Sequence, residues 1–388
     1  MRLAIVRQHY VSTRPAERQV ERALEALLER NVAISLYTRS WPQTRLNLIE
    51  PVICDAYHAG ALWREWSFTR SACAAIGDAP ADLVYSLERI LCCDVYHAAD
   101  GVYAAWLDEQ RRAAGVLRRA RLALGPYHRY MQWTERRLFA SAWLQKVVCP
   151  SKLVRDDIHQ RYGLPYSKLP VVYNAVDSEA LSPALRGHRA AARAQHGIAD
   201  GATVFLLAAT DAGDAATEAA TEAAIPALAR LTGLCHLIVA AEAATHDRCM
   251  ARAATFGVAD RVTLVDSRTD LRPYVGAADA FVAPALYDPA AVTTLEAMAC
   301  GLPAIATATG GIKDFAVHEH NAWIVERADV DGLVTAIRTL LADEQHRARL
   351  GRAARETVLA RFDEAAVAVA YEHLLRDVVS NGRAEAQA

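Results

Sequence analysis

The chain lacks any uninterrupted run of about 18 apolar residues, so the sequence predicts no membrane-spanning helix. No long apolar core precedes a cleavage site at the amino terminus, and we therefore expect no signal peptide. An excess of one charge is also missing, because 43 Lys and Arg nearly balance 45 Asp and Glu to a formal net charge of −2. The composition therefore gives no reason to expect a nucleic-acid partner.

Cysteine pairs of the metal-binding kind are absent as well. The eight cysteines are scattered, and none forms a C-x2-C pair, which argues against a disulfide framework and favours a reduced cytosol. We expect Cys92, Cys93 and Cys300 to pack as small apolar residues rather than to bind metal.

The length of 388 residues suits two domains, and 53% hydrophobic with 23% charged residues is typical of a soluble globular protein. Strand and helix signals alternate in both halves, a pattern that favours parallel sheets with helices on both faces. The expected strands are 3–6, 32–37, 83–86, 147–148, 203–208, 237–240, 262–265, 280–283 and 304–306, and the expected helices include 17–29 and 365–379.

The most informative stretch runs from Tyr287 to Gly311. A loop with Asp288 follows an apolar strand, a helical stretch carries Glu296, and Gly310-Gly311 closes the next strand. Open α/β sheets bind ligands at the carboxyl ends of their strands, and a helix N-terminus there suits a phosphate. Carboxylates beside it suit ribose and sugar hydroxyls. In the plainer interpretation, Glu296 only begins a core helix of an ordinary α/β domain.

This stretch resembles the donor-site motif of retaining glycosyltransferases with the GT-B fold (family 4, group 1). The motif is written E-x7-E, with the second Glu in the context L-E-A-x-A-x-G-x-P. Asp288 and Glu296 have this separation, although Asp replaces the first Glu and Ala291 replaces a frequent Gly. Residues 94–102 and 149–155 are similar to the lipopolysaccharide-core glucosyltransferases within that family.

The resemblance implies an α/β fold of the GT-B type, with two Rossmann-like parallel-sheet domains facing a central cleft. Residues 1–175 would form the acceptor-side domain and 176–364 the nucleotide-sugar-binding domain, with 365–388 crossing back onto the first. It also implies transfer of a hexose, with retention, from a UDP- or GDP-linked sugar to a saccharide or lipid-linked saccharide of the cell envelope. No cofactor and no metal are expected.

The roles that the resemblance implies fall on a few positions. Glu296 would accept hydrogen bonds from the donor ribose, and Asp288 would act at the donor sugar as a catalytic carboxylate. The backbone N–H groups of Val292, Thr293 and Thr294 would meet the distal phosphate. The remaining expected residues are Gly310, Gly311, Thr13 and Arg14 at the donor, and Asp100 (catalytic), Gly101 and Tyr103 on the acceptor side.

Three departures from the family pattern leave alternatives open. Pro15 stands in the loop that usually carries Gly-Gly, residues 206–218 hold acids but no Arg or Lys, and Tyr103 replaces a histidine. In one interpretation the chain is an active transferase, and Arg14 or Lys313 meets the diphosphate. In another it is catalytically degenerate and serves as a partner subunit or glycan-binding module. A dehydrogenase would need a G-x-G-x-x-G, which neither half contains.

A basic stripe covers residues 111–137, where eight arginines face the single acid Glu135 and alternate with aromatic and aliphatic residues. Such a stripe suits an anionic membrane surface, and it equally suits a solvated helical face whose arginine stems cover the core. The first interpretation places the protein in the cytoplasm, peripheral on the inner face of the membrane. Its expected membrane contacts are Arg111, Arg112, Arg118, Arg119 and Arg121.

Overall fold

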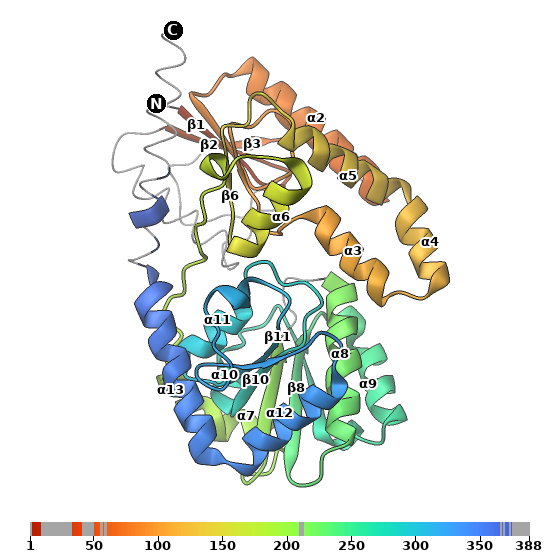
Figure 1. Ribbon diagram of the computed structural model, residues 1–388, viewed down its shortest axis with the longest axis vertical. Coiled ribbons are helices and arrows are strands. Elements are labelled where there is room, and N and C mark those ends of the chain that lie inside the picture. The colour runs from red at the N-terminus through yellow and green to blue at the C-terminus, as the bar shows by residue number, and fades with distance from the viewer. Residues whose placement is uncertain are drawn as a thin grey trace. The chain divides into compact units, whose positions relative to one another are not determined.

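The computed structural model describes residues 2–8, 33–40, 50–54, 57, 60–208, 213–364, 367, 369–371 and 374, with the backbone alone for 213–219. Contacts divide the chain into two compact units, residues 1–175 with 365–388 (unit 1) and residues 176–364 (unit 2). In Figure 1, residues 1–175 of unit 1 run from red to yellow, the described residues after 364 are blue, and unit 2 runs from green to blue.

Unit 1 contains a six-stranded parallel sheet in the order β3-β2-β1-β4-β5-β6. The order reverses between β1 and β4, which is where sheets of this kind bind ligands. The strands are β1 (Arg2–Val6), β2 (Ala33–Thr38), β3 (Glu50–Ile53), β4 (Leu83–Ser86), β5 (Val95–His97) and β6 (Lys146–Val148). The helices described in this unit are α2 (Gly60–Asp78), α3 (Tyr103–Ala113), α4 (Val116–Leu124), α5 (Pro126–Phe139), α6 (Lys152–Tyr162) and η1 (Tyr166–Lys168).

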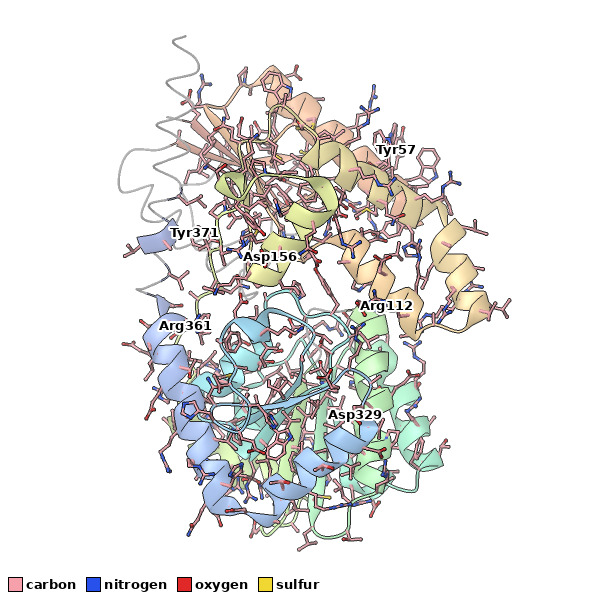
Figure 2. The ribbon with its side chains drawn as sticks, in the orientation of Figure 1. Tyr57, Arg112, Asp156, Asp329, Arg361 and Tyr371 are labelled. Atoms are coloured by element: carbon pink, nitrogen blue, oxygen red, sulfur yellow. A yellow bond between two sulfur atoms is a disulfide. The ribbon has the colours of Figure 1, made fainter. Side chains whose placement is uncertain are left out.

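The C-terminal stretch contributes to the core of unit 1. Val367, Tyr371 and Leu374 belong to the same buried cluster as Leu3 and Ile5 of β1, and Figure 2 labels Tyr371. The expected helix 365–379 is described at 367, 369–371 and 374 only, and the expected helix 17–29 lies outside the described residues.

Unit 2 repeats the design with the strand order β12-β11-β10-β7-β8-β9, again all parallel. The strands are β7 (Thr203–Ala208), β8 (Cys235–Ala241), β9 (Val262–Asp266), β10 (Ala280–Ala283), β11 (Ala304–Thr307) and β12 (Trp323–Val325). The helices described here are η2 (Pro183–His188), α7 (Arg189–Gln195), α8 (Gly213–Ala229), η3 (Ala243–Thr245), α9 (His246–Thr255), η4 (Ala259–Arg261), α10 (Arg272–Ala277), α11 (Val292–Ala299), η5 (Gly311–Asp314), α12 (Val330–Ala342) and α13 (Glu344–Arg361).

Strand β7 shows why the sequence folds into layers. Phe205 and Leu207 pack into the cluster that also contains residues of α8 and α12, whereas Val204 and Leu206 pack into the cluster with residues of α7 and α11. Successive side chains of a strand point to opposite faces, and a strand covered on both faces is apolar throughout. The continuous apolar run of β7 is therefore the sequence signal of a central parallel strand.

One expectation about cysteine is wrong. Cys73 of α2 and Cys92 in the loop between β4 and β5 form a disulfide, with Cα atoms 5.9 Å apart. The bond joins residues that only the fold brings together, so cysteine spacing gave no signal of it. Cys93 and Cys300 are buried free thiols, as expected. Among the helices of the described residues, none is long and apolar enough to cross a membrane.

Candidate functional site

The loops that follow β10 and β11 are bound together at the carboxyl edge of the unit 2 sheet. The hydroxyl groups of Thr307 and Thr309 both donate to the carbonyl of Ala285, at 2.6 and 2.7 Å. Further along both loops, the Gly311 N–H donates to the Asp288 carbonyl at 2.9 Å. β10 is the strand that pairs with β7 at the point where the strand order reverses. The two loops therefore form one unit at the expected ligand edge.

Gly310 is required by this contact. A Cβ atom at position 310 would lie 1.9 Å from the carbonyl oxygen of Asp288, closer than any non-bonded approach allows. Only glycine lets two backbones approach so closely.

The entry into α11 depends on Asp288 and Ala291. Asp288 Oδ1 accepts a hydrogen bond from the Ala291 N–H at 2.7 Å, so this carboxylate holds the turn before the helix. Ala291 adopts a left-handed conformation with φ 52° and ψ 37°. The position where the resembling family often has glycine is thus a true positive-φ site, and alanine there costs on the order of 1 kcal/mol.

The first turn of α11 presents unsatisfied polar groups. Among the described residues, no side chain caps this helix, so the N–H groups of Val292, Thr293 and Thr294 lack intrahelical partners. The Thr294 side chain is 1% exposed, and its hydroxyl oxygen has no hydrogen-bond partner. Free N–H groups and the positive end of the helix dipole together suit an anion.

Glu296 lies one turn into α11 and is half-buried. Burial, with the Glu296 carboxylate as a second cause, raises the pKa of the Cys300 thiol to about 12. Cys300 is therefore an inert thiol at neutral pH. Lys313, in η5 two residues after Gly311, is exposed.

The tripeptide Asp329-Val330-Asp331 is an Asp-x-Asp sequence at the start of α12. Asp329 Oδ1 accepts the Gly332 N–H at 2.8 Å and caps the helix, while Asp331 pairs with Arg230 at 2.5 Å. Figure 2 labels Asp329 at this helix start. Both carboxylates thus have structural partners, and no group of His, Cys, Asp or Glu within the described ranges is arranged to hold a metal ion.

In unit 1, the turn between β5 and α3 carries the expected acceptor-side residues. Asp100 is exposed, and Gly101 has φ 71°. The Arg89 guanidinium donates to the Gly101 carbonyl at 3.1 Å and lies 3.5 Å from Glu135. Glu135 is fully buried and accepts the N–H groups of Tyr103 and Ala104, at 2.6 and 3.0 Å. A buried ion pair therefore fixes both the turn and the start of α3.

Tyr103 is placed differently from its neighbours. Its side chain is 9% exposed and packs with Leu107 and Met131, and its hydroxyl lies 2.6 Å from His128 Nδ1. The side chain thus joins α3 to α5.

His97 is fully buried, and its Nδ1 lies 2.9 Å from the Tyr85 hydroxyl. Burial, and then Arg7, lower the pKa of His97 to about 4. It is therefore a neutral structural histidine.

Sequence reasoning missed a polar cluster at the carboxyl ends of β1 and β4. Glu88 Oε1 accepts the Gln8 N–H at 2.9 Å and lies 3.4 Å from the Arg7 guanidinium, and Gln8 Nε2 donates to Glu65 at 3.2 Å. Burial raises the pKa of Glu88 to about 7, against the opposing effect of Arg7. The available signal was position, because Gln8 and Glu88 each follow a strand at the reversal point.

The arginines of the basic stripe lie on α3, α4 and α5. Arg111 and Arg112 lie in the last turn of α3 and pair with Asp108 and Glu109, respectively. The Arg119 guanidinium donates to the backbone carbonyls of Arg111 and Arg112. On α4, exposed arginines stand beside exposed apolar residues, namely Arg118, Arg119 and Arg121 beside Val116, Leu117 and Leu124. Thr13, Arg14 and Asp211 lie outside the described residues, as do the side chains of Asp214 and Glu218.

Two family models match the chain. The model described as Glycosyltransferase Family 4 matches residues 16–180, and the model described as Glycosyl transferases group 1 matches residues 190–357. The first match lies in unit 1 except for its last few residues, and the second lies entirely in unit 2.

Curated relatives carry related names. The lipopolysaccharide core biosynthesis glycosyltransferase LpsE of Rhizobium meliloti (strain 1021) is 32% identical over 151 residues, 39% of this chain and 44% of the relative. The alpha-maltose-1-phosphate synthase of Mycolicibacterium smegmatis is 25% identical over 273 residues, 63% of this chain and 66% of the relative. These matches span less than two thirds of the length of either relative.

Solved structures share the fold at low identity. WaaG, a glycosyltransferase involved in lipopolysaccharide biosynthesis, matches with a TM-score of 0.81 and 20% identity over 95% of this chain and 98% of its own. Anabaena Alr3699/HepE in complex with UDP-glucose matches with a TM-score of 0.72 and 18% identity over 97% of this chain and 100% of its own. With two parallel six-stranded sheets and both domain matches, the chain belongs to the GT-B-fold glycosyltransferases, with a family 4 domain followed by a group 1 domain.

Proposed function

We propose that this chain transfers a hexose from a UDP- or GDP-linked sugar to a saccharide or lipid-linked saccharide acceptor, with retention at the anomeric carbon. The acceptor is part of lipopolysaccharide or another cell-envelope glycan. The observation that carries the proposal is the first turn of α11, where uncapped N–H groups and the buried Thr294 hydroxyl lie within about one turn before Glu296.

The donor would bind at this turn. The distal phosphate would accept from the N–H groups of Val292, Thr293 and Thr294, and Glu296 would accept from the ribose hydroxyls. Asp288 would reach the sugar hydroxyls while its Oδ1 holds the turn. Support comes from Anabaena Alr3699/HepE, a fold neighbour whose structures contain UDP and UDP-glucose.

Charge on the leaving diphosphate needs a cation. Retaining transfer in this fold is written as attack of the acceptor hydroxyl on the same face as the departing phosphate, which takes the hydroxyl proton. The sugar–phosphate bond breaks as the new glycosidic bond forms, so no protein nucleophile is needed. Lys313, which is exposed two residues after Gly311, would stabilise the phosphate in place of the usual Arg and Lys, together with Arg14.

Unit 1 would hold the acceptor. Asp100 and the Gly101 backbone lie in the β5–α3 turn. The carboxylates of Glu88, after β4, and of Glu65, on α2, would accept hydrogen bonds from the acceptor sugar. We also propose that the exposed arginines of α4 rest on the inner face of the cytoplasmic membrane, because arginines beside Val116, Leu117 and Leu124 suit an anionic interface.

The test is transfer itself. The purified chain is incubated with UDP- and GDP-linked hexoses and a saccharide acceptor panel, and NMR follows the anomeric configuration of the product. The proposal expects a product with the donor's anomeric configuration. It also expects the rate of transfer to fall by about 10²-fold or more in Lys313→Ala. An inverted product contradicts retention. No transfer and no donor hydrolysis with any donor would favour the degenerate binding-module alternative.

A further inference from the structure

A surface groove of about 720 Å³ lies in unit 1 between α2 and α5, two helices that run side by side (Figure 1). We call it the α2–α5 groove. Its walls include Trp66 and Ile76 of α2, Trp133 of α5, and Trp143 beyond α5, and Leu91 lies in the loop that the disulfide ties to α2. The volume is in the range of ligand pockets, about 300–1,000 Å³. None of the residues assigned above to donor or acceptor lines it.

The groove offers few hydrogen-bond partners. Asp94 accepts the Val84 N–H at 2.7 Å and faces Gln145 Nε2 at 3.5 Å, so its carboxylate has internal partners. The Thr134 side chain is 2% exposed, and its hydroxyl oxygen has no partner. A sugar ring needs several polar partners in a site that excludes water. The lining therefore favours a ligand with an apolar body.

The rim of the groove combines tryptophan with arginine. Trp66, Trp133 and Trp143 are 39%, 49% and 75% exposed. The guanidinium of Arg70 lies 5.9 Å from the Trp66 ring centroid, and that of Arg137 lies 5.6 Å from the Trp133 ring centroid. Within the described part of the chain, no carboxylate lies in ion-pair distance of either guanidinium. Amphipathic indole rings beside cations above an apolar groove are the chemistry of a lipid–water interface.

The apolar surface continues past α5. α4 contacts α5 and carries Leu117 and Val116, which are 88% and 82% exposed, among its arginines. Apolar side chains that are exposed together on one short helix form a patch, and contiguous exposed apolar patches mark protein or membrane interaction sites. The arginines and the exposed apolar side chains of α4 and α5 therefore both fit a lipid–water interface.

We propose that the α2–α5 groove takes one acyl chain of an anionic phospholipid, whose headgroup phosphate is met by Arg70 and Arg137. The proposal rests on the membrane contact proposed above and deepens it. That contact alone would leave the lipid chains undisturbed, whereas the groove removes one chain from the bilayer and orients unit 1 on the surface.

The experiment uses the full chain and vesicles of phosphatidylcholine, with or without phosphatidylglycerol, whose acyl chains are brominated at mid-chain or left plain. Bromine quenches tryptophan fluorescence only at close range. We expect quenching with brominated vesicles that contain phosphatidylglycerol, and a smaller quenched fraction in the Trp133→Phe/Trp143→Phe double variant, in which Trp66 is the remaining tryptophan of the groove. Adding soluble oligosaccharide acceptors should not protect these tryptophans.

Gly77 allows the groove to be blocked without a clash. It lines the groove near the end of α2, and a Cβ atom there meets nothing within 4 Å. Gly77→Phe should displace at least two methylenes, and at about fourfold in partition per methylene this weakens vesicle binding by about 16-fold or more and abolishes mid-chain quenching. Ala74→Phe is the matched control, because Ala74 is exposed on the same helix outside the groove. Thermal unfolding checks that both variants fold.

The outcomes separate the two proposals. Two outcomes overturn the acyl-chain site and leave the surface contact standing. The first is vesicle binding by wild type without quenching by mid-chain bromine. The second is a Gly77→Phe variant that binds vesicles and is quenched to the same extent as wild type. No binding to any vesicle overturns both while the transfer reaction is untouched. Oligosaccharide that shields Trp133 and Trp143 would make the groove a glycan site and would also overturn the proposal.

Discussion

The carbonyl oxygen of Asp288 occupies the space into which a side chain at Gly310 would extend, since a Cβ atom there would lie 1.9 Å from it. This contact joins the loop before α11 to the loop after β11, and the Gly311 N–H completes it. The position of the α11 N-terminus therefore depends on the absence of a side chain at Gly310.

Gly310→Ala should damage the donor site through this contact. The Asp288 loop must move by more than an ångström, so we expect nucleotide affinity to fall at least ~10-fold and stability to fall by about 2 kcal/mol. Calorimetric titration and chemical denaturation measure both. Gly187→Ala is the control, since its Cβ would meet nothing within 4 Å. Unchanged nucleotide binding in Gly310→Ala would show that the loop pairing does not position the site.

Ala291→Gly should act in the opposite direction. Alanine is strained at φ 52°, and glycine is not. Against the entropy that glycine adds to the unfolded chain, we expect a net gain of about 0.5–1 kcal/mol in the free energy of unfolding. Chemical denaturation at neutral pH tests this. A loss of stability would mean that the residue does not adopt the left-handed conformation.

Removing the buried Glu135 charge should be costly. In Glu135→Gln the Arg89 guanidinium, with a side chain 11% exposed, loses its carboxylate partner. Breaking a buried pair on one side costs ~3–5 kcal/mol, and the start of α3 loses its charged acceptor. The control is Asp331→Asn, whose pair with Arg230 is exposed and should contribute less than about 1 kcal/mol. Equal effects of the two variants on the denaturation midpoint would contradict the buried-pair account.

Glu88 should make stability fall as pH rises. Its pKa in the folded protein is about 7, above the ordinary value near 4.3, so the folded state binds the extra proton between these values. For an acid with a raised pKa, this contribution is greatest below the unfolded pKa and is lost as pH rises to about 7. Relative to Glu88→Gln, the wild type should therefore lose stability between pH 5 and pH 8. Denaturation midpoints of both proteins across this window give the answer, and parallel curves would refute the shift.

The disulfide should contribute to stability through the unfolded chain. Cys73 and Cys92 are 19 residues apart, a separation for which chain entropy gives about 3 kcal/mol. Dithiothreitol should lower the thermal midpoint of the wild type and leave that of Cys73→Ser/Cys92→Ser unchanged. A wild-type midpoint that ignores the reductant would mean that the bond does not form in solution.

Much of the fold could be predicted because buried parallel strands are continuous apolar runs. β4, β7 and β10 have the expected bounds. β3 and β12 were missed, because Pro51 and the polar residues around Trp323 conceal strands of only four and three residues. Edge strands of this kind are set by the neighbour they pair with and not by their own pattern.

The candidate site was predictable only in part. The spacing of Asp288 and Glu296 located the loop and helix, but the hydrogen bond from Ala291 to Asp288 depends on a left-handed residue that composition does not reveal. The contacts of Glu135 with Arg89 and Tyr103 span 46 and 32 residues of sequence and arise from tertiary packing. Local patterns carry no information on such partners.

The central claim is that α11 binds a nucleoside diphosphate through its first turn and Glu296. Calorimetric titration of UDP and of GDP into wild type, Glu296→Ala and the control Glu356→Ala tests it most directly, because Glu356 is exposed on α13. The account predicts micromolar binding of one nucleotide by wild type and control, and a loss of at least ~10-fold in Glu296→Ala. Binding that is equal in all three proteins, or no binding of either nucleotide at millimolar concentration, would contradict it.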